Sequence, residues 1–152
     1  MSQQPLSIAV KTPFPFLNTL LSLRYQKKTS SMTARAKFLN RFNNAFAKGD
    51  THYIAEQLTD DIVWEMVGEF NIQGKEAFQD SLREMEGVET LDMQILNTIT
   101  HGRTAAVNGT MKIKEASGEV KSFGFCDVYE FNGFKNAKIK KMTSYVSPLK
   151  EH

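Results

Sequence analysis

The strongest constraint on the fold is a series of four long segments in which apolar and polar side chains alternate. Alternation is expected of strands, because successive side chains point to opposite faces of a sheet. The four segments are 90–101, 104–114, 120–131 and 137–146. Turn-forming pairs separate them: His101-Gly102, Ser117-Gly118 and Asn132-Gly133. Short turns of this kind join antiparallel neighbours, so the second half of the chain is predicted to form an antiparallel meander.

Helical patterns come before this meander. Apolar residues recur at helical spacing from Phe38 to Phe46, and Gly49 follows as a stop signal. Further helices are predicted over 51–58 and 75–85, the latter with Ala77, Phe78, Leu82 and Met85 on its apolar stripe, and a strand over 62–68. The expected fold is α+β: a cone-shaped, strongly curved antiparallel sheet packed on three N-terminal helices. The mouth of such a cone is the predicted ligand pocket.

Composition narrows the class of protein. The 152 residues are 41% hydrophobic and 24% charged, as in a single soluble domain. The single cysteine, Cys126, excludes an internal disulfide and a cysteine-based metal cage, and three scattered histidines do not match a zinc pattern. No apolar run approaches the ~20 residues that cross a bilayer. We therefore predict a cytoplasmic protein without a metal, a cofactor or a membrane partner.

The N-terminal segment differs from the rest of the chain. Residues 1–31 contain three of the four prolines and no acidic side chain, and are predicted to be a disordered or extraneous tail before a domain at 32–152. The first 49 residues carry eight basic groups, so the remainder is net negative although the whole chain is +2. An acidic body makes a nucleic-acid partner improbable.

One acidic residue lies on an unexpected face of its strand. In the segment SFGFCDVYEFNG, alternation places Asp127 on the same side as Phe123, Phe125, Tyr129 and Phe131. A carboxyl group among aromatic rings is desolvated, which raises its pKa and equips it to donate or shuttle a proton. The alternative is that Asp127 is a structural residue, whose buried carboxyl group is hydrogen-bonded to a neighbouring hydroxyl or amide. Both interpretations stay open at this point.

The order of elements resembles the nuclear transport factor 2-like superfamily, and within it the SnoaL-like polyketide cyclases and ketosteroid-isomerase-like proteins. The resemblance covers residues 33–148. It rests on these motifs: Gly49-Asp50, Asp60-Asp61 as a turn before a Trp-bearing strand, Gly74-Lys75-Glu76, and CDVYEFNGFKNAKIKKMTSYV. These motifs specify a fold on which very different reactions occur. The resemblance also implies a homodimer formed through the outer sheet face. Cys126, Val128 and Tyr145 on that face are less polar than the side chains of a solvent-exposed sheet usually are.

The resemblance implies which site residues this chain shares with those enzymes. Ketosteroid isomerases have a proton-shuttling Asp where this chain has Met66, and an oxyanion-binding Tyr where it has Phe42. Their second oxyanion donor, a protonated Asp, corresponds to Asp127. SnoaL-like cyclases use one pocket carboxylate as the acid and base, and Asp127 fits that role. Limonene-epoxide-hydrolase relatives need an Asp-Arg-Asp set, which this chain lacks because Arg103 lies at a turn.

Eight further residues are predicted to contact a ligand beside the catalytic candidate Asp127. They are Phe42, Trp64, Met66, Asn97, Phe125, Tyr129, Met142 and Ser144. Trp64 and Met66 are alternatively core residues, and Asn97 alternatively bonds to backbone at a bulge. The predicted function is binding of an apolar small molecule, with isomerase, cyclase or lyase chemistry at Asp127. The alternative is a non-catalytic ligand-binding or dimeric assembly module.

Overall fold

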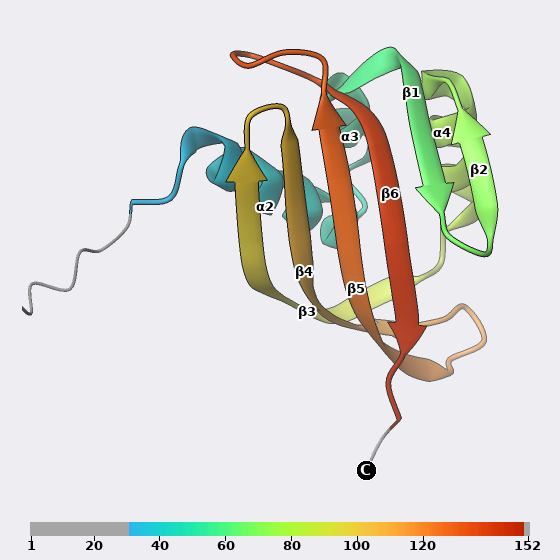
Figure 1. Ribbon diagram of the computed structural model, residues 1–152. Helices are drawn as coiled ribbons and strands as arrows, with labels where there is room; N and C mark the ends of the chain where they lie inside the picture. The colour runs from blue at the N-terminus through green and yellow to red at the C-terminus, as the bar shows by residue number, and fades with distance from the viewer. Residues whose placement is uncertain (1–30, 151–152) are drawn as a thin grey trace, which may run out of the picture. The chain divides into compact units, whose positions relative to one another are not determined.

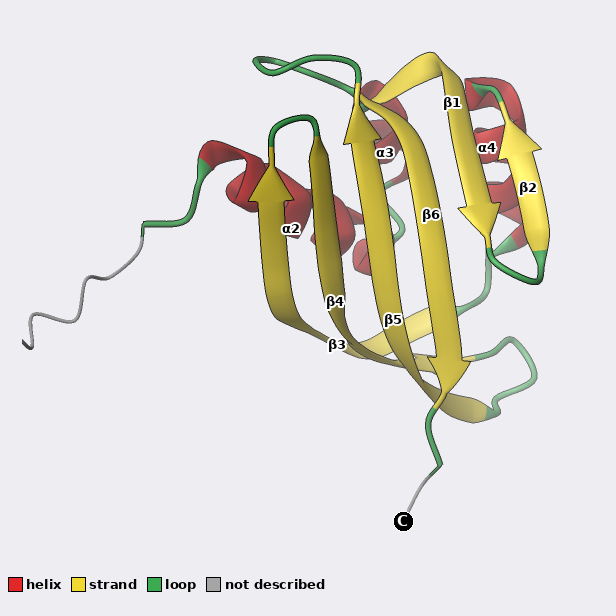
Figure 2. Ribbon diagram, in the orientation of Figure 1, coloured by secondary structure: helices red, strands yellow, loops and turns green. Residues whose placement is uncertain are grey.

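Three helices lie on one face of a sheet in the computed structural model, which describes residues 31–150 (Figures 1 and 2). They are α2 (Ala34–Lys48), α3 (Thr51–Glu56) and α4 (Lys75–Glu84). The Thr33 side chain accepts a hydrogen bond from the Ala36 amide, and Asp50 caps α3 through the Tyr53 amide. Gly49 ends α2 in the left-handed conformation at φ 67°, which suits glycine. These ends match the stop and cap signals in the sequence.

The sheet contains six strands among the described residues. They are β1 (Leu58–Met66), β2 (Phe70–Gln73), β3 (Glu89–His101), β4 (Thr104–Lys114), β5 (Val120–Phe131) and β6 (Ile139–Pro148). Their spatial order is β2-β1-β6-β5-β4-β3, and the sheet does not close into a barrel. Strands β3 to β6 form the predicted meander, and they bend around the helices in Figure 1. The α+β fold with a curved sheet on three helices is confirmed.

Three details of the sheet differ from the prediction. The sheet is mixed, because β1 pairs parallel with β6 while all the other pairs of neighbouring strands are antiparallel. The residues Asp60-Asp61 belong to β1 and do not form a turn; the pairing with β6 shifts register between Leu58 and Val63 instead. The short strand β2 was not predicted, because its four residues alternate too briefly to be recognised.

Two irregularities in β3 determine which side chains face the helices. The register with β4 shifts between Thr90 and Asp92 and again between Ile95 and Asn97. Each shift adds a residue on one strand, so the alternation of faces changes phase there. Met93 and Ile95 therefore pack toward the core, whereas Ile99 is 66% exposed.

The core lies between the concave face of the sheet and the helices. Aromatic rings dominate it: Trp64 packs on Phe78 at 4.8 Å between centroids, and Phe42 meets Phe46 at 5.3 Å. Leu39, Ile62 and Ile139 are completely buried around them. None of the helices in residues 31–150 is long and apolar enough to cross a lipid bilayer. The predicted tail, residues 1–31, lies outside the described residues except for Ser31, and stays a prediction.

Candidate functional site

A cavity of about 130 Å³ lies between the concave face of the sheet and the helices. Every strand except β2 contributes to its wall, together with α2 and the residue that follows α4. The lining residues are Asn43, Phe46, Ala47, Trp64, Met66, Met85, Thr90, Met93, Met111, Phe125, Asp127, Tyr129, Met142, Ser144 and Val146. Most of this wall is apolar, and its polar groups are few.

A chain of hydrogen bonds anchors Asp127 in this cavity. The Tyr129 hydroxyl lies 3.3 Å from Asp127 Oδ2 and donates to it. Asn43 Nδ2 donates to the same Tyr129 oxygen at 3.1 Å and to the Leu39 carbonyl at 2.9 Å. The amide of Asn43 is thus fixed by its own helix. Its Oδ1 also lies 3.3 Å from the Tyr129 hydroxyl, so Asn43 and Asp127 both accept from that hydroxyl.

The cross-strand neighbour of Asp127 is Ser144, which stands opposite it in the β5–β6 register. Ser144 is 3% exposed, and its Oγ accepts a hydrogen bond from Trp64 Nε1 at 3.1 Å. With the indole donating to it, the Ser144 hydroxyl proton is available to the carboxyl group of Asp127. Two hydroxyls therefore flank the acid, one from its own strand and one from β6.

Burial raises the pKa of Asp127 above its ordinary value of 3.8, because desolvation penalises the carboxylate more than the neutral acid. The hydrogen bonds from Ser144 and Tyr129 oppose this rise without cancelling it. Among the described residues that line the cavity, none is a lysine, an arginine or a histidine. Burial, and next the charge of Asp127, raise the pKa of Tyr129 well above 10.0, so its hydroxyl stays protonated.

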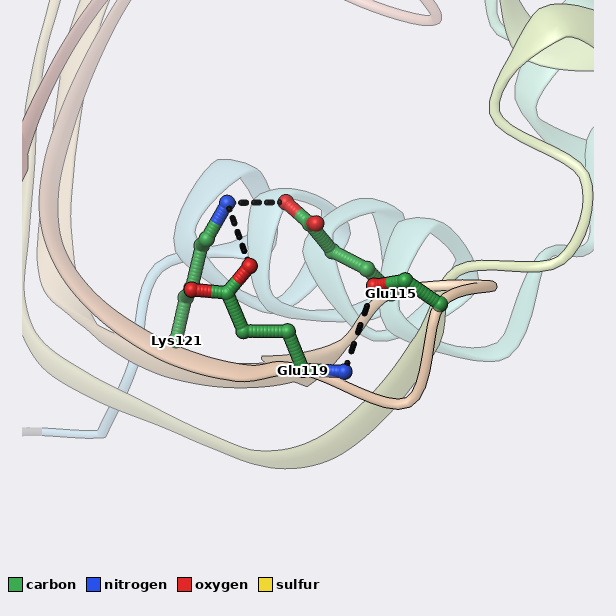
Figure 3. A network of polar contacts seen from close by, with 4 residues as sticks. Glu115, Glu119 and Lys121 are labelled. Carbon is green, nitrogen blue, oxygen red and sulfur yellow. Dashed lines mark hydrogen bonds and ion pairs between the residues drawn. The ribbon is translucent and has the colours of Figure 1, made fainter.

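The single lysine of β5, Lys121, is already neutralised by two carboxylates. Figure 3 shows its ammonium group between Glu115 Oε1, at 2.7 Å, and Glu119 Oε2, at 3.4 Å. The hydrogen bond with Glu115 is the main reason that the pKa of Lys121 is raised above 10.5. Alternation places Lys121 on the same face of β5 as Asp127. Its ammonium group, however, forms ion pairs with Glu115 and Glu119 beside the β4–β5 turn.

Methionine is the commonest residue in the cavity wall. Five of the seven methionines of the chain line it: Met66, Met85, Met93, Met111 and Met142. Methionine has three rotatable bonds and a polarisable sulfur, so it fills irregular space and adapts to different shapes. A cavity with this wall is shaped by flexible side chains around a fixed acid.

Most of the predicted site residues meet at this cavity. Seven of the nine line it: Trp64, Met66, Phe125, Asp127, Tyr129, Met142 and Ser144. Phe42 and Asn97 do not. Phe42 is completely buried behind the wall, where its ring meets the edge of Tyr129 at 6.0 Å. Asn97 is exposed on the outer side of β3, where its Nδ2 donates to Asn108 Oδ1 at 3.0 Å, because the bulge after Ile95 reverses the alternation.

Asn43, which donates a hydrogen bond to Tyr129, was not among the site residues predicted from the sequence. A signal for it was present: Asn43 follows Leu39 by four residues and precedes Phe46 by three, so it lies on the apolar stripe of the first helix. A polar residue on such a stripe is buried, and it needs a hydrogen-bond partner. Asn43 is 5% exposed and has two.

Comparison with known proteins decides the family. The model of the SnoaL-like domain matches residues 39–142, more than half of the chain. The chain belongs to the SnoaL-like family. The matched residues include every strand except the last part of β6, and they hold Asn43, Asp127 and Tyr129. No curated protein matches this SnoaL-like chain.

Solved structures support the same fold. An NTF2-like protein of unknown function from Cytophaga hutchinsonii has 24% identity and a TM-score of 0.56, covering 71% of this chain and 95% of its own. An LEH-like epoxide hydrolase from M. tuberculosis has 25% identity and a TM-score of 0.62, covering 74% and 80%. A putative SnoaL-like polyketide cyclase from Mesorhizobium loti has 23% identity and a TM-score of 0.59, covering 75% and 99%.

Proposed function

We propose that this SnoaL-like protein binds an apolar small molecule in the cavity, with Asp127 as the acid and base that acts on an oxygen of that ligand. The observation that carries the proposal is the environment of Asp127: a half-buried carboxyl group in an apolar wall, with hydroxyl donors and no cation among the lining side chains. Buried carboxyl groups without a counter-charge are costly, and they concentrate at functional sites.

The arrangement supports proton transfer between Asp127 and a carbonyl or hydroxyl oxygen. In its neutral form Asp127 donates a proton to the ligand oxygen, and the resulting carboxylate then accepts a proton from carbon or from another oxygen. Tyr129 stabilises the carboxylate through its hydroxyl, which Asn43 holds in place. Isomerisation, cyclisation and elimination of a carbonyl compound all use such a step, so the proposed reaction class is isomerase, cyclase or lyase without a cofactor.

Epoxide hydrolysis by an Asp-Arg-Asp set is a weaker proposal for this chain. Arg103 lies in the turn between β3 and β4, with its guanidinium 5.9 Å from the ring centre of Phe134. Asp127 is the single carboxylate among the residues that line the cavity in the described part of the chain. The likeness to the M. tuberculosis epoxide hydrolase therefore supports the fold and a cavity of this type more than it supports that reaction.

Asp127→Asn tests the catalytic role, because asparagine keeps the shape but cannot release the proton. The probe is cyclohexanone in D2O, whose exchange of hydrogens next to the carbonyl is followed by NMR. We expect wild-type protein to accelerate this exchange and Asp127→Asn to lose at least about 100-fold of the acceleration, since general acid–base groups contribute about 10²–10⁴-fold. Asp61→Asn changes an exposed acid outside the cavity, and it should exchange at the wild-type rate.

The stability of the same variant separates a catalytic from a structural acid. The pKa of Asp127 is raised in the folded protein, so its contribution to stability is fully present below the unfolded pKa of 3.8 and declines as the pH rises through the folded pKa. Asp127→Asn lacks this decline, and near neutral pH we expect it to be at least as stable as wild type. A variant that unfolds more easily at pH 7 and exchanges protons normally would show a structural acid.

A second function, assembly through the outer sheet face, is favoured by a specific observation. Apolar side chains are exposed there on β5, β6 and β3: Val128 at 38%, Tyr145 at 51% and Ile99 at 66%. Tyr145 stands opposite Cys126 in the β5–β6 register, and Val128 stands opposite Ala106 in the β4–β5 register. Apolar groups gathered on one open face are typical of an interface. We propose that two copies of the chain pair through this face.

The test of the pairing is sedimentation velocity at micromolar concentration. Wild-type protein is expected to sediment as a dimer, and Tyr145→Glu should shift it to the monomer because a charge would be buried against the partner. Phe134→Ser removes an exposed aromatic group from the β5–β6 loop and should leave the dimer intact. A monomeric wild type would refute the pairing without affecting the cavity.

A further inference from the structure

The size of the cavity sets a limit on the ligand. A cavity of about 130 Å³ is close to the engineered apolar cavity of about 150 Å³ that holds one benzene ring. Pockets for drug-sized ligands measure about 300–1,000 Å³. The cavity as it stands therefore holds one six-membered ring, and a fused two-ring molecule would have to displace part of the wall.

The polar groups of the wall lie together at one end of the cavity, so they match a ligand that carries one oxygen on its ring. Asp127, Tyr129, Ser144 and Asn43 are joined by hydrogen bonds and adjacent strand positions, so they form one polar end. The methionines, Trp64 and Phe46 make the remaining wall apolar. A ligand that fits both parts has one hydrogen-bonding oxygen at one end and hydrocarbon elsewhere.

The charge of the wall favours a neutral ligand. An anionic ligand would meet Asp127 and its hydrogen-bonded neighbours without any lysine, arginine or histidine among the lining residues described. Burying a charge without a partner is costly, so carboxylates are disfavoured. An ammonium group would need Asp127 to be ionised, which burial of that group opposes.

One residue of the cavity wall is more exposed to solvent than the others. Met85 is the single exposed residue, at 47%, among the fifteen described lining residues, and the others are buried or half-buried. It follows the last turn of α4, where its amide is bonded to the Leu82 carbonyl and its carbonyl to the Val88 amide. The backbone is held while the side chain is open to solvent, so the flexible thioether of Met85 lies at the solvent-exposed edge of the cavity wall.

From these observations we infer that the ligand is a neutral compound with a single ring and one oxygen that meets Asp127, and that Met85 sets the upper limit of its size. This inference rests on the proposed function, because it assumes that the cavity is the binding site. It adds the class of ligand and a residue that determines specificity.

The experiment measures the affinity of graded probes by isothermal titration calorimetry on the full chain. The size series is phenol, 2-naphthol and 9-phenanthrol, and the charge series is phenol, benzoate and benzylamine. We expect phenol to bind at least about tenfold more tightly than 2-naphthol, because an additional ring overfills the cavity. Benzoate and benzylamine should each bind more weakly than phenol.

Met85→Ala and Met32→Ala form the matched pair of variants. Met32 is exposed to a similar extent, 44%, but does not line the cavity. Met85→Ala should reduce the preference for phenol over 2-naphthol by at least about fivefold, by opening the mouth to the larger ring. Met32→Ala should keep the wild-type preference.

The possible results separate this inference from the proposed function. If 2-naphthol or 9-phenanthrol binds wild type as tightly as phenol, the size limit is wrong while apolar ligand binding stands. If either charged probe binds more tightly than phenol, the assignment of a neutral ligand is wrong. Equal effects of Met85→Ala and Met32→Ala would remove Met85 from its role. Failure of every probe to bind would overturn the cavity as a binding site, and both proposals with it.

Discussion

Gly109→Ala is expected to destabilise the protein by about 3 kcal/mol, a large effect for the addition of one methyl group. A Cβ atom at this position would lie 2.0 Å from the Gln94 carbonyl oxygen and 3.0 Å from Phe125 Cε1. The first contact is with backbone, which cannot rotate away, so β3 and β4 would have to separate. Gly109 pairs with Ile95 next to the bulge in β3. Urea unfolding followed by circular dichroism measures the loss.

Gly124→Ala is the control for this prediction. Gly124 also lies within the sheet, but a Cβ atom there would have Leu149 Cδ2 as its nearest neighbour at 3.6 Å, an ordinary contact. Alanine should therefore leave stability unchanged or raise it by about 0.4–1 kcal/mol, because it reduces the freedom of the unfolded chain. Equal stabilities of the two variants would show that the strands do not approach as closely at Gly109 as described.

Phe42→Ala is expected to lower the free energy of unfolding by about 3–5 kcal/mol. The ring is completely buried, and it contacts Phe38, Phe46 and Tyr129 with centroids 5.3–6.2 Å apart. Its removal would leave a void behind the wall of the cavity, because these neighbours are held in α2 and β5 and cannot all move into the space. The free energy is measured by chemical unfolding.

Phe134→Ala provides the comparison for Phe42→Ala. Phe134 is 73% exposed in the loop between β5 and β6, so its removal should change stability by no more than about 0.5 kcal/mol. If Phe42→Ala were as mild, Phe42 would not be the core residue that its burial indicates. The prediction from the sequence that Phe42 contacts a ligand would then have to be tested again.

The sequence predicted the architecture because its signals were local. Alternation over ten or more residues and glycine-bearing turns specify β3 to β6, and Gly49 and Asp50 specify the boundary between two helices. The parallel pairing of β1 with β6 could not be predicted, since it joins segments about 80 residues apart and leaves no local pattern. The short strand β2 could not be predicted either, since it forms by pairing with β1 rather than from a pattern of its own.

The residues that line the cavity were predicted where alternation is unbroken and missed where it is not. Strand β5 has no register shift between Val120 and Glu130, so Phe125, Asp127 and Tyr129 face the cavity as expected. Strand β3 has two shifts, which turn Asn97 away from the cavity. Met85 was expected on the buried stripe of its helix, but it lies just after the helix end, where helical spacing no longer applies.

The titration of Asp127 tests the central claim most directly, because the proposed chemistry and the inferred ligand both depend on an acid in an apolar, cation-free cavity. The measurement follows the carboxyl ¹³C resonance of Asp127 by NMR from acidic to neutral pH in the ligand-free protein. We predict a pKa above the ordinary 3.8, and a further rise in Tyr129→Phe, which removes a hydrogen bond that lowers it. A pKa at or below 3.8 would show that Asp127 is solvated or paired with a cation, and it would contradict the account.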